Sequence, residues 1–597
     1  MSIIVQKFGG TSVANADKIR AAAKRAVAAK QAGHQVVMVV SARGKKTDEL
    51  VRLAAEMSEH PAAREMDMLL STGEQESVSL MAMAVHSLGE KAVSLTGGQI
   101  GIITDSTFSR ARIESISTDR IRKHLDAGEI VIACGFQGID PEMNITTLGR
   151  GGSDTTATAL AAALQADECQ IYTDVEGVFT TDPRVVSEAR KVSLLAYDEM
   201  LELASLGAGV MHSRSIEFAK KFCVPLRVRP SFDEGEGTLI ANTGEQRMVA
   251  GLALARNEAR VTLADLPDQP GVTSCIFACM AKRKIPVDMV VQNVAVDGKA
   301  TVSFTVQEGE LADTLTAANE AIKILGAGTI RSGTNVAKLS VVGAGMRNHS
   351  GVAAQMFHIL LKKGINLQMI TTSEIKISVL VERDRCDEAL LAVHEGFCME
   401  TAGPQTPEIG IQQKTKSPEC DQSEDQLLSR IVSKLAKMED IVVSEVQLDE
   451  SQSRVTLHHI PDVPGTCSEI FTTVANKNIM VDMIVQNVSD TGHAEVSFTV
   501  QRTDLENCLK LVEELASKWA DATVSYEPEI GKLTVVGIGL RTHTGVGERM
   551  FKALADANIN IQMINTSEIR MSAVVAADQG RTGFEVLNKA FNLVEEA

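Results

Sequence analysis

The 597-residue sequence lacks the long apolar run of a membrane-spanning helix, and its first residues lack a signal-peptide pattern. It also lacks a basic excess: the formal net charge is −18, which argues against a general nucleic-acid or acidic-membrane binder. The ten cysteines include no CxxC pair and form no disulfide framework, as in proteins of a reducing cytosol. We therefore expect a cytoplasmic protein without nucleic-acid or membrane partners.

Metal-binding and common nucleotide-binding motifs are absent as well. Cys275 and Cys279 lie four residues apart, but no His or Cys cluster completes a zinc site, so we predict no metal held by the protein. Neither the Walker A pattern GxxxxGK[ST] nor the dinucleotide fingerprint GxGxxG occurs. A P-loop kinase and a nicotinamide-dependent oxidoreductase are therefore disfavoured.

A duplication occupies the C-terminal half of the chain. Residues 261–307 align with 455–501 at an offset of 194, and 27 of the 47 positions are identical. The same offset aligns 337–357 with 531–551. Each copy contains two halves that follow the order strand, turn, helix, strand, strand, helix. The polar stretch 403–425 between the copies has the composition of a linker.

A chain of this length needs several hydrophobic cores. In the first 245 residues, strands such as 3–8 and 129–136 alternate with helical stretches such as 153–166, which predicts an α/β domain with a mainly parallel sheet. The predicted units are an N-terminal domain at 1–245, module 1 at 246–335, module 2 at 336–402, the linker at 403–425, module 3 at 426–529 and module 4 at 530–597.

Each copy also begins with an extra predicted strand, at 249–255 and at 443–449. The second half of each copy ends on a helix with no strand after it. We infer that the leading strand completes the sheet of that second half, so that the two halves interlock. Exposed strand edges also favour pairing between chains, and we expect a homodimer.

The segment IVQKFGGTSV poses the first functional question. Lys7 stands where a predicted buried strand meets the double glycine Gly9-Gly10. A solvated lysine on a surface turn would explain this pattern. A phosphate site would explain it equally well, because glycines let backbone N–H groups approach an anion and the ammonium group meets its charge.

A second glycine-rich stretch, residues 149–154, lies between a short strand and a long Ala-rich helix that Ser153 or Asp154 can cap. The helix N-terminus offers free N–H groups, and Arg150 adds a fork suited to a carboxylate or phosphate. A capped helix after a tight turn is the simpler explanation, but glycines on both sides of Arg150 exceed what capping requires. Because parallel sheets bind ligands at the carboxyl ends of their strands, we favour a binding site.

Further polar residues follow other strands. Thr173 and Asp174 end the strand in YTDVEGVFTTDPR, where they could bind ribose, adenine or hydrated Mg²⁺, or simply form a polar loop. Ser41 ends another strand, Thr47 follows six residues later, and Glu74 could pair with a ligand ammonium group. Taken alone, each of the last three is better explained as a cap or a solvated charge.

Taken together, five segments closely resemble the motifs of aspartate kinases of the amino-acid kinase family in order and spacing: KFGGTSV, VVSARGKKTD, LLSTGEQES, TTLGRGGSDTTA and YTDVEGVFTTDPR. The duplicated C-terminal modules resemble ACT domains, which bind amino-acid effectors. The resemblance covers essentially the whole chain. It implies an amino-acid-kinase domain followed by two pairs of ferredoxin-like βαββαβ modules. It also implies ATP-dependent phosphorylation of L-aspartate to 4-phospho-L-aspartate, the first step toward lysine, threonine and methionine.

The resemblance implies a role for each matching residue. The catalytic residues would be Lys7, Arg150 and Asp154. L-Aspartate would be held by Ser41, Thr47, Glu74, Arg150, Gly151, Gly152 and Ser153. ATP would be held by Lys7, Phe8, Gly9, Gly10, Thr173, Asp174, Phe179, Asp182 and Arg184, and would itself carry most of the Mg²⁺ coordination.

The sequence departs from the common pattern in two respects. It carries four ACT modules where the common short forms have two, and it ends with the ACT repeat, so we expect no homoserine dehydrogenase extension. Some relatives place a second lysine near the end of the kinase domain, but VPLRVRPSFDEGEGT contains none. Arg227 or Arg229 could take that role.

The implied reaction needs no general base. The β-carboxylate of aspartate has an unperturbed pKa of about 3.9, so it is already a nucleophile at neutral pH. Phosphoryl transfer requires in-line positioning and neutralisation of charge on the γ-phosphoryl group. Lys7, Mg²⁺ and the helix N-terminus at 152–154 would supply them.

Effectors of ACT pairs lie at interfaces between modules. A shared hairpin and cap would explain the matching Val and Phe residues of the two copies, but explains the identical Gln-Asn pairs less well. The predicted effector residues of the first copy are Asp268, Pro270, Gly271, Val272, Thr273, Asp288, Gln292, Asn293, Val294, Asn366 and Ser373. Those of the second are Asp462, Gly465, Thr466, Cys467, Asp482, Gln486, Asn487, Val488, Asn560 and Ser567. The resemblance implies feedback inhibition by lysine, threonine or both.

Two alternative functions remain open at this point. Another amino-acid kinase, acting on glutamate, acetylglutamate or a nucleotide, is disfavoured by the ACT modules and by the Glu74 segment. A non-catalytic amino-acid sensor with a kinase-like scaffold is disfavoured by the intact Lys7, Arg150 and Asp154. Substrate profiling distinguishes the first alternative, and ATP turnover distinguishes the second.

Overall fold

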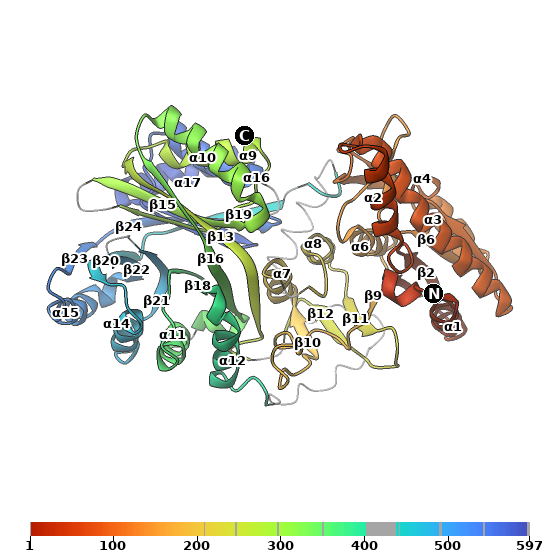
Figure 1. Ribbon diagram of the computed structural model, residues 1–597, viewed down its shortest axis with the longest axis horizontal. Coiled ribbons are helices and arrows are strands. Elements are labelled where there is room, and N and C mark those ends of the chain that lie inside the picture. The colour runs from red at the N-terminus through yellow and green to blue at the C-terminus, as the bar shows by residue number, and fades with distance from the viewer. Residues whose placement is uncertain are drawn as a thin grey trace.

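The computed structural model describes residues 2–207, 209–244, 247–294, 298–348, 351–401, 437–440, 442–488, 492–540 and 544–593. The predicted linker at 403–425 lies outside the described residues. Figure 1 shows the N-terminal domain on one side and the four C-terminal modules on the other. Within the described ranges, no helix is both long and apolar enough to cross a membrane.

An eight-stranded sheet forms the centre of the N-terminal domain, in the order β10-β12-β11-β9-β1-β2-β6-β3. Only the β11–β12 pair is antiparallel among the described pairings, so the predicted mainly parallel sheet is confirmed. The strands are β1 (Ile3–Phe8), β2 (Gln35–Val40), β3 (Ala92–Leu95), β6 (Ile130–Cys134), β9 (Glu168–Thr173), β10 (Leu194–Ala196), β11 (Leu226–Pro230) and β12 (Thr238–Ala241).

Helices cover both faces of this sheet because its strands are apolar on both sides. Val36, Met38 and Val40 of β2 are buried in a cluster with α1 and α3, whereas Val37 and Val39 are buried on the face that α6 covers. A small sheet of order β5-β4-β7-β8 completes the domain. These elements are η1 (Gly10–Val13), α1 (Ala16–Gln31), α2 (Lys46–Met57), α3 (Ala63–Ser87), α4 (Gly97–Ile100), β4 (Ile102–Thr104), β5 (Ile113–Ile116), α5 (Asp119–Asp126), β7 (Gln137–Ile139), β8 (Ile145–Thr147), α6 (Gly152–Leu164), α7 (Tyr197–Ser205) and α8 (Ser213–Lys221).

The C-terminal elements follow the predicted order of strands and helices. In the first copy they are β13 (Gly251–Pro267), α9 (Val272–Lys282), β14 (Asp288–Val294), β15 (Lys299–Gln307), η2 (Glu308–Glu310), α10 (Leu311–Leu325), β16 (Thr329–Val342), η3 (Ala344–Asn348), α11 (Val352–Lys362), β17 (Met369–Ser373), β18 (Lys376–Glu382), η4 (Arg383–Arg385) and α12 (Cys386–Gly396). In the second they are β19 (Val442–Asp449), β20 (Gln452–Pro461), α14 (Thr466–Ala475), β21 (Val481–Val488), β22 (His493–Gln501), η5 (Arg502–Asp504), α15 (Leu505–Ala516), β23 (Thr523–Glu527), β24 (Ile530–Ile538), α16 (Thr544–Asp556), β25 (Met563–Thr566), β26 (Arg570–Ala576) and α17 (Ala577–Ala590).

The interlocking of the two halves is confirmed. The start of β13 pairs with the end of β16, with Gly251 opposite Val342, and β19 pairs with β24. The leading strand of the first copy is not separate, however, since it continues into the first strand of module 1 as β13. The start of β16 in turn completes module 1, with Arg260 opposite Gly333, a strand that the sequence reading missed. The predicted boundary at 335–336 therefore falls inside a strand that modules 1 and 2 share.

The modules pack across the two copies, within one chain. Modules 1 and 4 form one layer of helices, α10, α9, α16 and α17, and modules 2 and 3 form a second layer, α12, α11, α14 and α15 (Figure 1). Phe277 packs on Phe551 with ring centroids 5.3 Å apart, and Phe357 on Phe471 at 5.5 Å. Strands β17 and β21 pair directly between the copies. The helices thus lie outside, and a core rich in methionine and valine lies between the sheets.

Candidate functional site

A cavity of about 960 Å³ lies where β1 and β2 end and α6 begins. Small-molecule sites typically have volumes of this order. It lies at the carboxyl ends of parallel strands, the expected place for a ligand in such a sheet. The cavity is lined by these predicted residues: Lys7, Gly9, Gly10, Ser41, Thr47, Glu74, Arg150, Gly151, Gly152, Ser153 and Asp154.

Lys7 and Asp154 form the central ion pair of this cavity. Nζ of Lys7 lies 2.6 Å from Oδ1 of Asp154, and both side chains are mostly buried. A Cβ at Gly9 would lie 3.5 Å from Nζ of Lys7, and a Cβ at Gly10 would lie 2.6 Å from the carbonyl oxygen of Ala42. Gly10 therefore lets the chain approach the loop after β2, whereas a Cβ at Gly9 would make only ordinary van der Waals contact with the ammonium group.

The start of α6 differs from the prediction. The N-cap is Gly151, which has a φ of 70° and makes no side-chain cap hydrogen bond, so the prediction that Ser153 or Asp154 caps the helix is wrong. The helix begins earlier than expected, which puts both side chains in its first turn. They line the cavity instead of closing the helix end, and Asp154 is free to pair with Lys7.

Glu74 lies deep in the same cavity, on α3, with only 4% of its surface exposed. Its Oε1 accepts a hydrogen bond from the backbone N–H of Ala42 at 2.9 Å, while Oε2 is buried without a partner in the described structure. Burial raises the pKa of Glu74 to about 7, and the hydrogen bond from Ala42 opposes this shift. A ligand ammonium group would satisfy Oε2 and favour the ionised form.

Asp67 is a functional candidate that the sequence reading missed. It is fully buried on α3, two turns before Glu74, and accepts hydrogen bonds from the backbone N–H of Thr147 at 2.8 Å and of Ser109 at 2.9 Å. Thr147 ends the strand that leads into the glycine-rich loop. Asp67 therefore anchors the base of that loop to α3. An acidic residue seven positions before Glu74, on the same helix face, was the available signal.

Of the residues predicted to bind ATP, some line the cavity and others do not. Gly9 and Gly10 line the cavity, but Phe8 is buried on the other face of the sheet and stacks on Tyr172 with ring centroids 4.6 Å apart. The other predicted residues lie at the end of β9 (Glu168–Thr173) and in the loop at 174–184, at the same sheet edge as Lys7, and do not line the cavity. These are Thr173, Asp174, Phe179, Asp182 and Arg184. In this loop Arg184 holds Asp182 in a two-pronged ion pair that lowers the pKa of the carboxyl group.

Neither proposed substitute for a second lysine lines the cavity. Nε of Arg227 lies 3.0 Å from Glu168, and Arg229 lies over the ring of Tyr172. Among the described residues, no cluster of three or more His, Cys, Asp or Glu side chains could hold a metal ion.

Comparisons with known proteins match both parts of the chain. Residues 2–230 match the model of the amino acid kinase family, and residues 339–397, 458–515 and 533–591 match an ACT domain model. The aspartate kinase Ask_LysC of Stutzerimonas stutzeri is 47% identical over 412 residues, which cover 68% of this chain and 100% of the relative. The chain belongs to the aspartate kinase family.

Two solved family members differ in how much of the chain they match. The crystal structure of aspartate kinase from Synechocystis covers 99% of this chain and 98% of its own, with 37% identity and a TM-score of 0.52. E. coli aspartokinase III covers 66% of this chain and 99% of its own, with 26% identity. Its complex with aspartate and ADP gives a TM-score of 0.57, and its complex with lysine and aspartate 0.52. The shorter relatives have no room for both C-terminal copies.

The predicted effector residues around the two DxPG turns meet across the copies of this family member. Nδ2 of Asn366 donates to Oδ1 of Asp462 at 2.9 Å, and the matching Asn560 donates to Asp268 at 2.7 Å. Gln486 donates to the carbonyl oxygen of Leu367 at 3.0 Å. The space left around Asp462 is about 10 Å³, room for no more than a water molecule. An effector would have to replace these contacts.

Most of the remaining predicted effector residues belong to the part of the chain that the structure describes. Gly271 and Gly465 are left-handed N-caps of α9 and α14, with φ of 94° and 109°. Thr273 donates to Gln292, and its counterpart Cys467 donates to Gln486. The predictions for the side chains of Asn293, Val294 and Val488 lie outside the described residues. Pro270, Val272 and Thr466 lie at the same turns, Asn487 accepts from Ser303, and Ser567 accepts from the backbone of Arg570.

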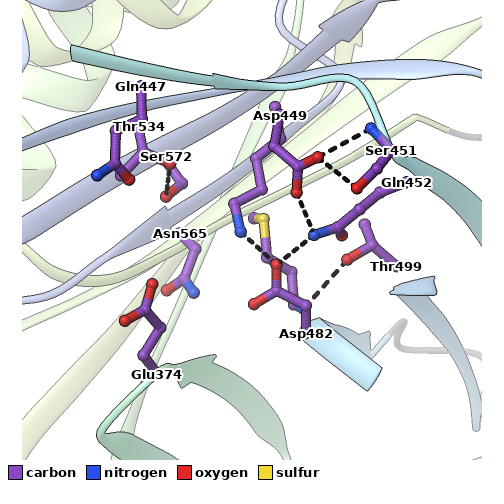
Figure 2. A network of polar contacts seen from close by, with 12 residues as sticks. Glu374, Gln447, Asp449, Ser451, Gln452, Asp482, Thr499, Thr534, Asn565 and Ser572 are labelled. Atoms are coloured by element: carbon purple, nitrogen blue, oxygen red, sulfur yellow. Dashed lines mark hydrogen bonds and ion pairs between the residues drawn. The ribbon is translucent and has the colours of Figure 1, made fainter. Parts of the chain in front are cut away.

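A larger cavity, of about 310 Å³, lies between modules 2 and 3. Figure 2 shows Asp449, Gln452 and Asp482 pointing toward one another there; Nε2 of Gln452 donates to both carboxylates at 2.8 Å. Lys532 pairs with Asp482. The hydroxyl group of Ser373, which also lines the cavity, is buried without a partner in the described structure. The predicted residues Ser373 and Asp482 thus border an open, polar space.

The matching position between modules 1 and 4 keeps a smaller cavity, of about 50 Å³, which Asp288 and Ser567 help to line. Lys338, the counterpart of Lys532, is 1% exposed and pairs with Asp288 and Glu258. Two substitutions distinguish the copies at the offset of 194: Glu258 becomes Gln452, and Ala255 becomes Asp449. The sequence reading missed Asp449, Gln452 and Lys532. A comparison of the two copies for charge changes would have found the first two.

Proposed function

We propose that the protein is a feedback-regulated aspartate kinase that transfers the γ-phosphoryl group of ATP to the β-carboxylate of L-aspartate. The observation that carries this proposal is the Lys7–Asp154 pair at the N-terminus of α6, in one cavity with the unpartnered Oε2 of Glu74. Together they offer a phosphate-directed cation and an ammonium-directed anion. L-Aspartate carries the ammonium group and the acceptor carboxylate that such a cavity needs.

Each active-site residue would either bind a substrate or neutralise charge on the transferring phosphoryl group. Oε2 of Glu74 accepts the α-ammonium group, and Arg150, exposed at the rim, takes a substrate carboxylate through its guanidinium fork. The β-carboxylate oxygen forms the new bond to the γ-phosphorus as the bond from that phosphorus to the β–γ bridging oxygen breaks. ADP leaves with the electron pair of that bond. Lys7 and the positive end of the α6 helix dipole stabilise the charge on the transferring group.

The residues at the end of β1 fit a nucleotide. Gly9 and Gly10 line the cavity beside Lys7, and the absence of a side chain at Gly10 lets the backbone pass close to the carbonyl oxygen of Ala42. Thr173, Asp174 and the loop to Arg184 lie at the same sheet edge and would hold the adenosine part. Mg²⁺, held mainly by the phosphates, would neutralise charge on the transferring group.

Regulation is proposed to act through the cavity between modules 2 and 3. Its lining presents three carboxylates, Glu374, Asp449 and Asp482, against two cations: Lys532 pairs with Asp482, and Arg570 pairs with Glu374. This excess of negative charge favours a cationic amino acid, and lysine is the ligand bound by the related E. coli enzyme. Threonine, with a neutral side chain, would bind at the DxPG turns only by replacing the Asn366–Asp462 and Asn560–Asp268 contacts. Such regulation would be feedback inhibition, in which the end products lysine and threonine inhibit an early step of their own synthesis.

Two further proposals follow from the sequence. A homodimer is supported by β19, which lies at the edge of its sheet and leaves one side unpaired among the described strands. Light scattering that gives only a monomer would overturn it. A cytoplasmic location is supported by the free cysteines of the described residues, several of them buried.

Substrate profiling tests the function. Purified protein is incubated with Mg-ATP and with L-aspartate, L-glutamate, N-acetyl-L-glutamate or a nucleoside monophosphate, and ADP release is followed. Hydroxylamine traps the acyl phosphate product as a hydroxamate. We expect turnover and a β-hydroxamate with L-aspartate alone. Preference for another acceptor supports a different amino-acid kinase, and lysine binding without ATP turnover supports a sensor.

A further inference from the structure

A short segment that leads into the second copy lies against the N-terminal domain. We call residues 437–440 the arm. Its backbone follows β5, with the N–H of Met438 2.9 Å from the carbonyl oxygen of Glu114 and the N–H of Glu439 3.2 Å from that of Ile113. Met438, Glu439 and Asp440 also line the active-site cavity. A piece of the chain numbered within the regulatory half thus forms part of the catalytic wall.

Helix α8 holds the arm from one face. Nη2 of Arg214 lies 2.8 Å from Oε1 of Glu439, and Nε lies 3.0 Å from the same atom. Seven residues later, Nζ of Lys221 donates to the carbonyl oxygens of Met438 at 2.6 Å and Asp440 at 3.0 Å. Residues seven apart lie on the same side of a helix. The side chains of Arg214 and Glu439 are 17% and 9% exposed, so solvent competes little with their pairing.

The N-terminal end of α8, which carries Arg214, also holds the glycine-rich loop at 149–153 that we assign to L-aspartate. Nη1 of Arg214 donates to the carbonyl oxygen of Leu148 at 2.5 Å, and Nη2 donates to that of Ala111 at 3.0 Å. Leu148 directly precedes the loop that carries Arg150. His212, the N-cap of α8, packs so close to Gly151 that a Cβ there would lie 2.3 Å from its own Cβ. Arg214 therefore joins the arm to the base of the aspartate loop through one guanidinium group.

We propose that Glu439 is a positioning residue for the aspartate-binding loop and acts through Arg214. Its carboxylate fixes the guanidinium group in the orientation that holds Leu148. Without that charge, the guanidinium group can turn toward an anionic ligand in the cavity, and the loop loses its anchor. Glu439 touches no reacting atom in this account. The inference rests on the proposed function, because it assigns the loop at 149–153 to aspartate.

The arm also connects this loop to the effector cavity. It runs into β19 after one residue, and Asp449, at the far end of that strand, lines the cavity between modules 2 and 3. A strand of this length spans roughly 25 Å. The shorter relatives have no room for the second copy and so lack this connection. The arm is thus a device of the four-module chain.

The test compares Glu439→Gln with Glu445→Gln in the full-length protein. Glu445 is exposed on β19 and provides the same change of charge outside the cavity lining. For Glu439→Gln we expect the KM for L-aspartate to rise roughly tenfold, with kcat and the KM for ATP changed less than about twofold. Glu439→Asp, which keeps the charge, should recover part of the loss. Glu445→Gln should match the parent.

Hydrogen exchange supplies the second readout. Amides of residues 147–153 should exchange faster in Glu439→Gln than in Glu445→Gln, while the rest of the N-terminal domain is unchanged. Faster exchange together with a raised KM supports the proposal. Either change alone overturns it, because the loop would then not connect the arm to aspartate. A parent-like result in both measurements overturns it as well.

Two features keep this test independent of other failures. Hydrogen exchange needs no substrate, so it reports on the arm even if the acceptor is not aspartate. If Glu439→Gln does not fold, Lys221→Gln loosens the arm at the other end of α8. The same rise in KM and in exchange is expected, and their absence contradicts the proposal.

Discussion

Nζ of Lys7, at the end of β1, lies 2.6 Å from Oδ1 of Asp154, in the first turn of α6. The pair joins the two segments that sequence alone singled out as phosphate-directed. It holds a cation in place before substrates bind, so little reorganisation is needed during phosphoryl transfer. Catalysis in this account depends on that preorganised charge.

Replacing Lys7 with alanine should therefore abolish most of the activity. We expect kcat to fall by roughly 10²- to 10³-fold, the usual cost of removing one charge-stabilising donor. Lys7→Arg keeps the charge and should retain more activity than Lys7→Ala. Steady-state kinetics of ADP release with saturating L-aspartate measure both variants. A kcat for Lys7→Ala within tenfold of the parent would contradict the role of Lys7.

Glu74 should impose a pH dependence on aspartate capture. Burial raises its pKa to about 7 in the free protein, and only the ionised form attracts an ammonium group. The ratio kcat/KM for L-aspartate should rise about tenfold per pH unit below this pKa and level off above it. Glu74→Gln should lose this bend and raise the KM. A parent profile that is flat between about pH 6 and 8 would refute the assignment.

The same pKa shift has a consequence for stability. The folded pKa of Glu74 is raised from 4.5 to about 7, so the folded state binds a proton that the unfolded state releases. Stability contributed by this site is therefore lost as the pH rises through that interval. Glu74→Gln should become more stable than the parent as the pH increases, by up to about 3 kcal/mol near pH 8. Thermal unfolding of both proteins at about pH 5 and pH 8 measures the difference.

Gly151 offers a test of the substrate loop with a matched control. Its φ is 70°, and an added Cβ would lie 2.3 Å from the Cβ of His212. Gly128 has a φ of 72° and no atom within 4 Å of such a Cβ. Alanine at either position should cost about 1–2 kcal/mol of stability through the left-handed backbone, and Gly151→Ala should cost more because of the contact with His212. Only Gly151→Ala should also raise the KM for L-aspartate; equal kinetics in the two variants would contradict the assignment.

The effector cavity between modules 2 and 3 can be tested without touching the active site. Asp482→Asn removes one carboxylate from the lining and should abolish lysine binding by calorimetry, along with any inhibition by lysine. Asp521, exposed in the same module and outside the lining, provides the control Asp521→Asn. Uninhibited turnover should be parent-like in both variants. Unchanged lysine binding in Asp482→Asn would place the effector elsewhere.

Patterns of short range made much of this molecule predictable. The alternation of strands with helices predicted the parallel sheet. The offset of 194 predicted the leading strands that interlock the two halves of each copy. Residues such as Lys7, Glu74 and Asp154 lie in one cavity because parallel strands end at one edge. Successive side chains of a strand point to opposite faces, so Phe8 must face away from its neighbour Lys7. The prediction that Phe8 contacts ATP did not take this into account.

Contacts between distant segments could not be predicted in this way. The pairing of Asn560 with Asp268 depends on how the two copies pack, and neither residue carries a local signal for it. The pairing of Glu439 with Arg214 joins residues 225 positions apart, in different predicted units, so no local pattern announces it. The left-handed N-cap at Gly151 could not be predicted either. Ser153 and Asp154, which follow it, are residue types that cap helices more often.

The most direct test of the whole account is hydroxamate formation from Mg-ATP and L-aspartate, in the parent and in Lys7→Ala, with and without lysine. The account predicts aspartyl β-hydroxamate from the parent, suppression of its formation by lysine, and almost none from Lys7→Ala. Folded parent protein that binds lysine but forms no hydroxamate would contradict the account, because the Lys7–Asp154 cavity would then not transfer phosphate to aspartate.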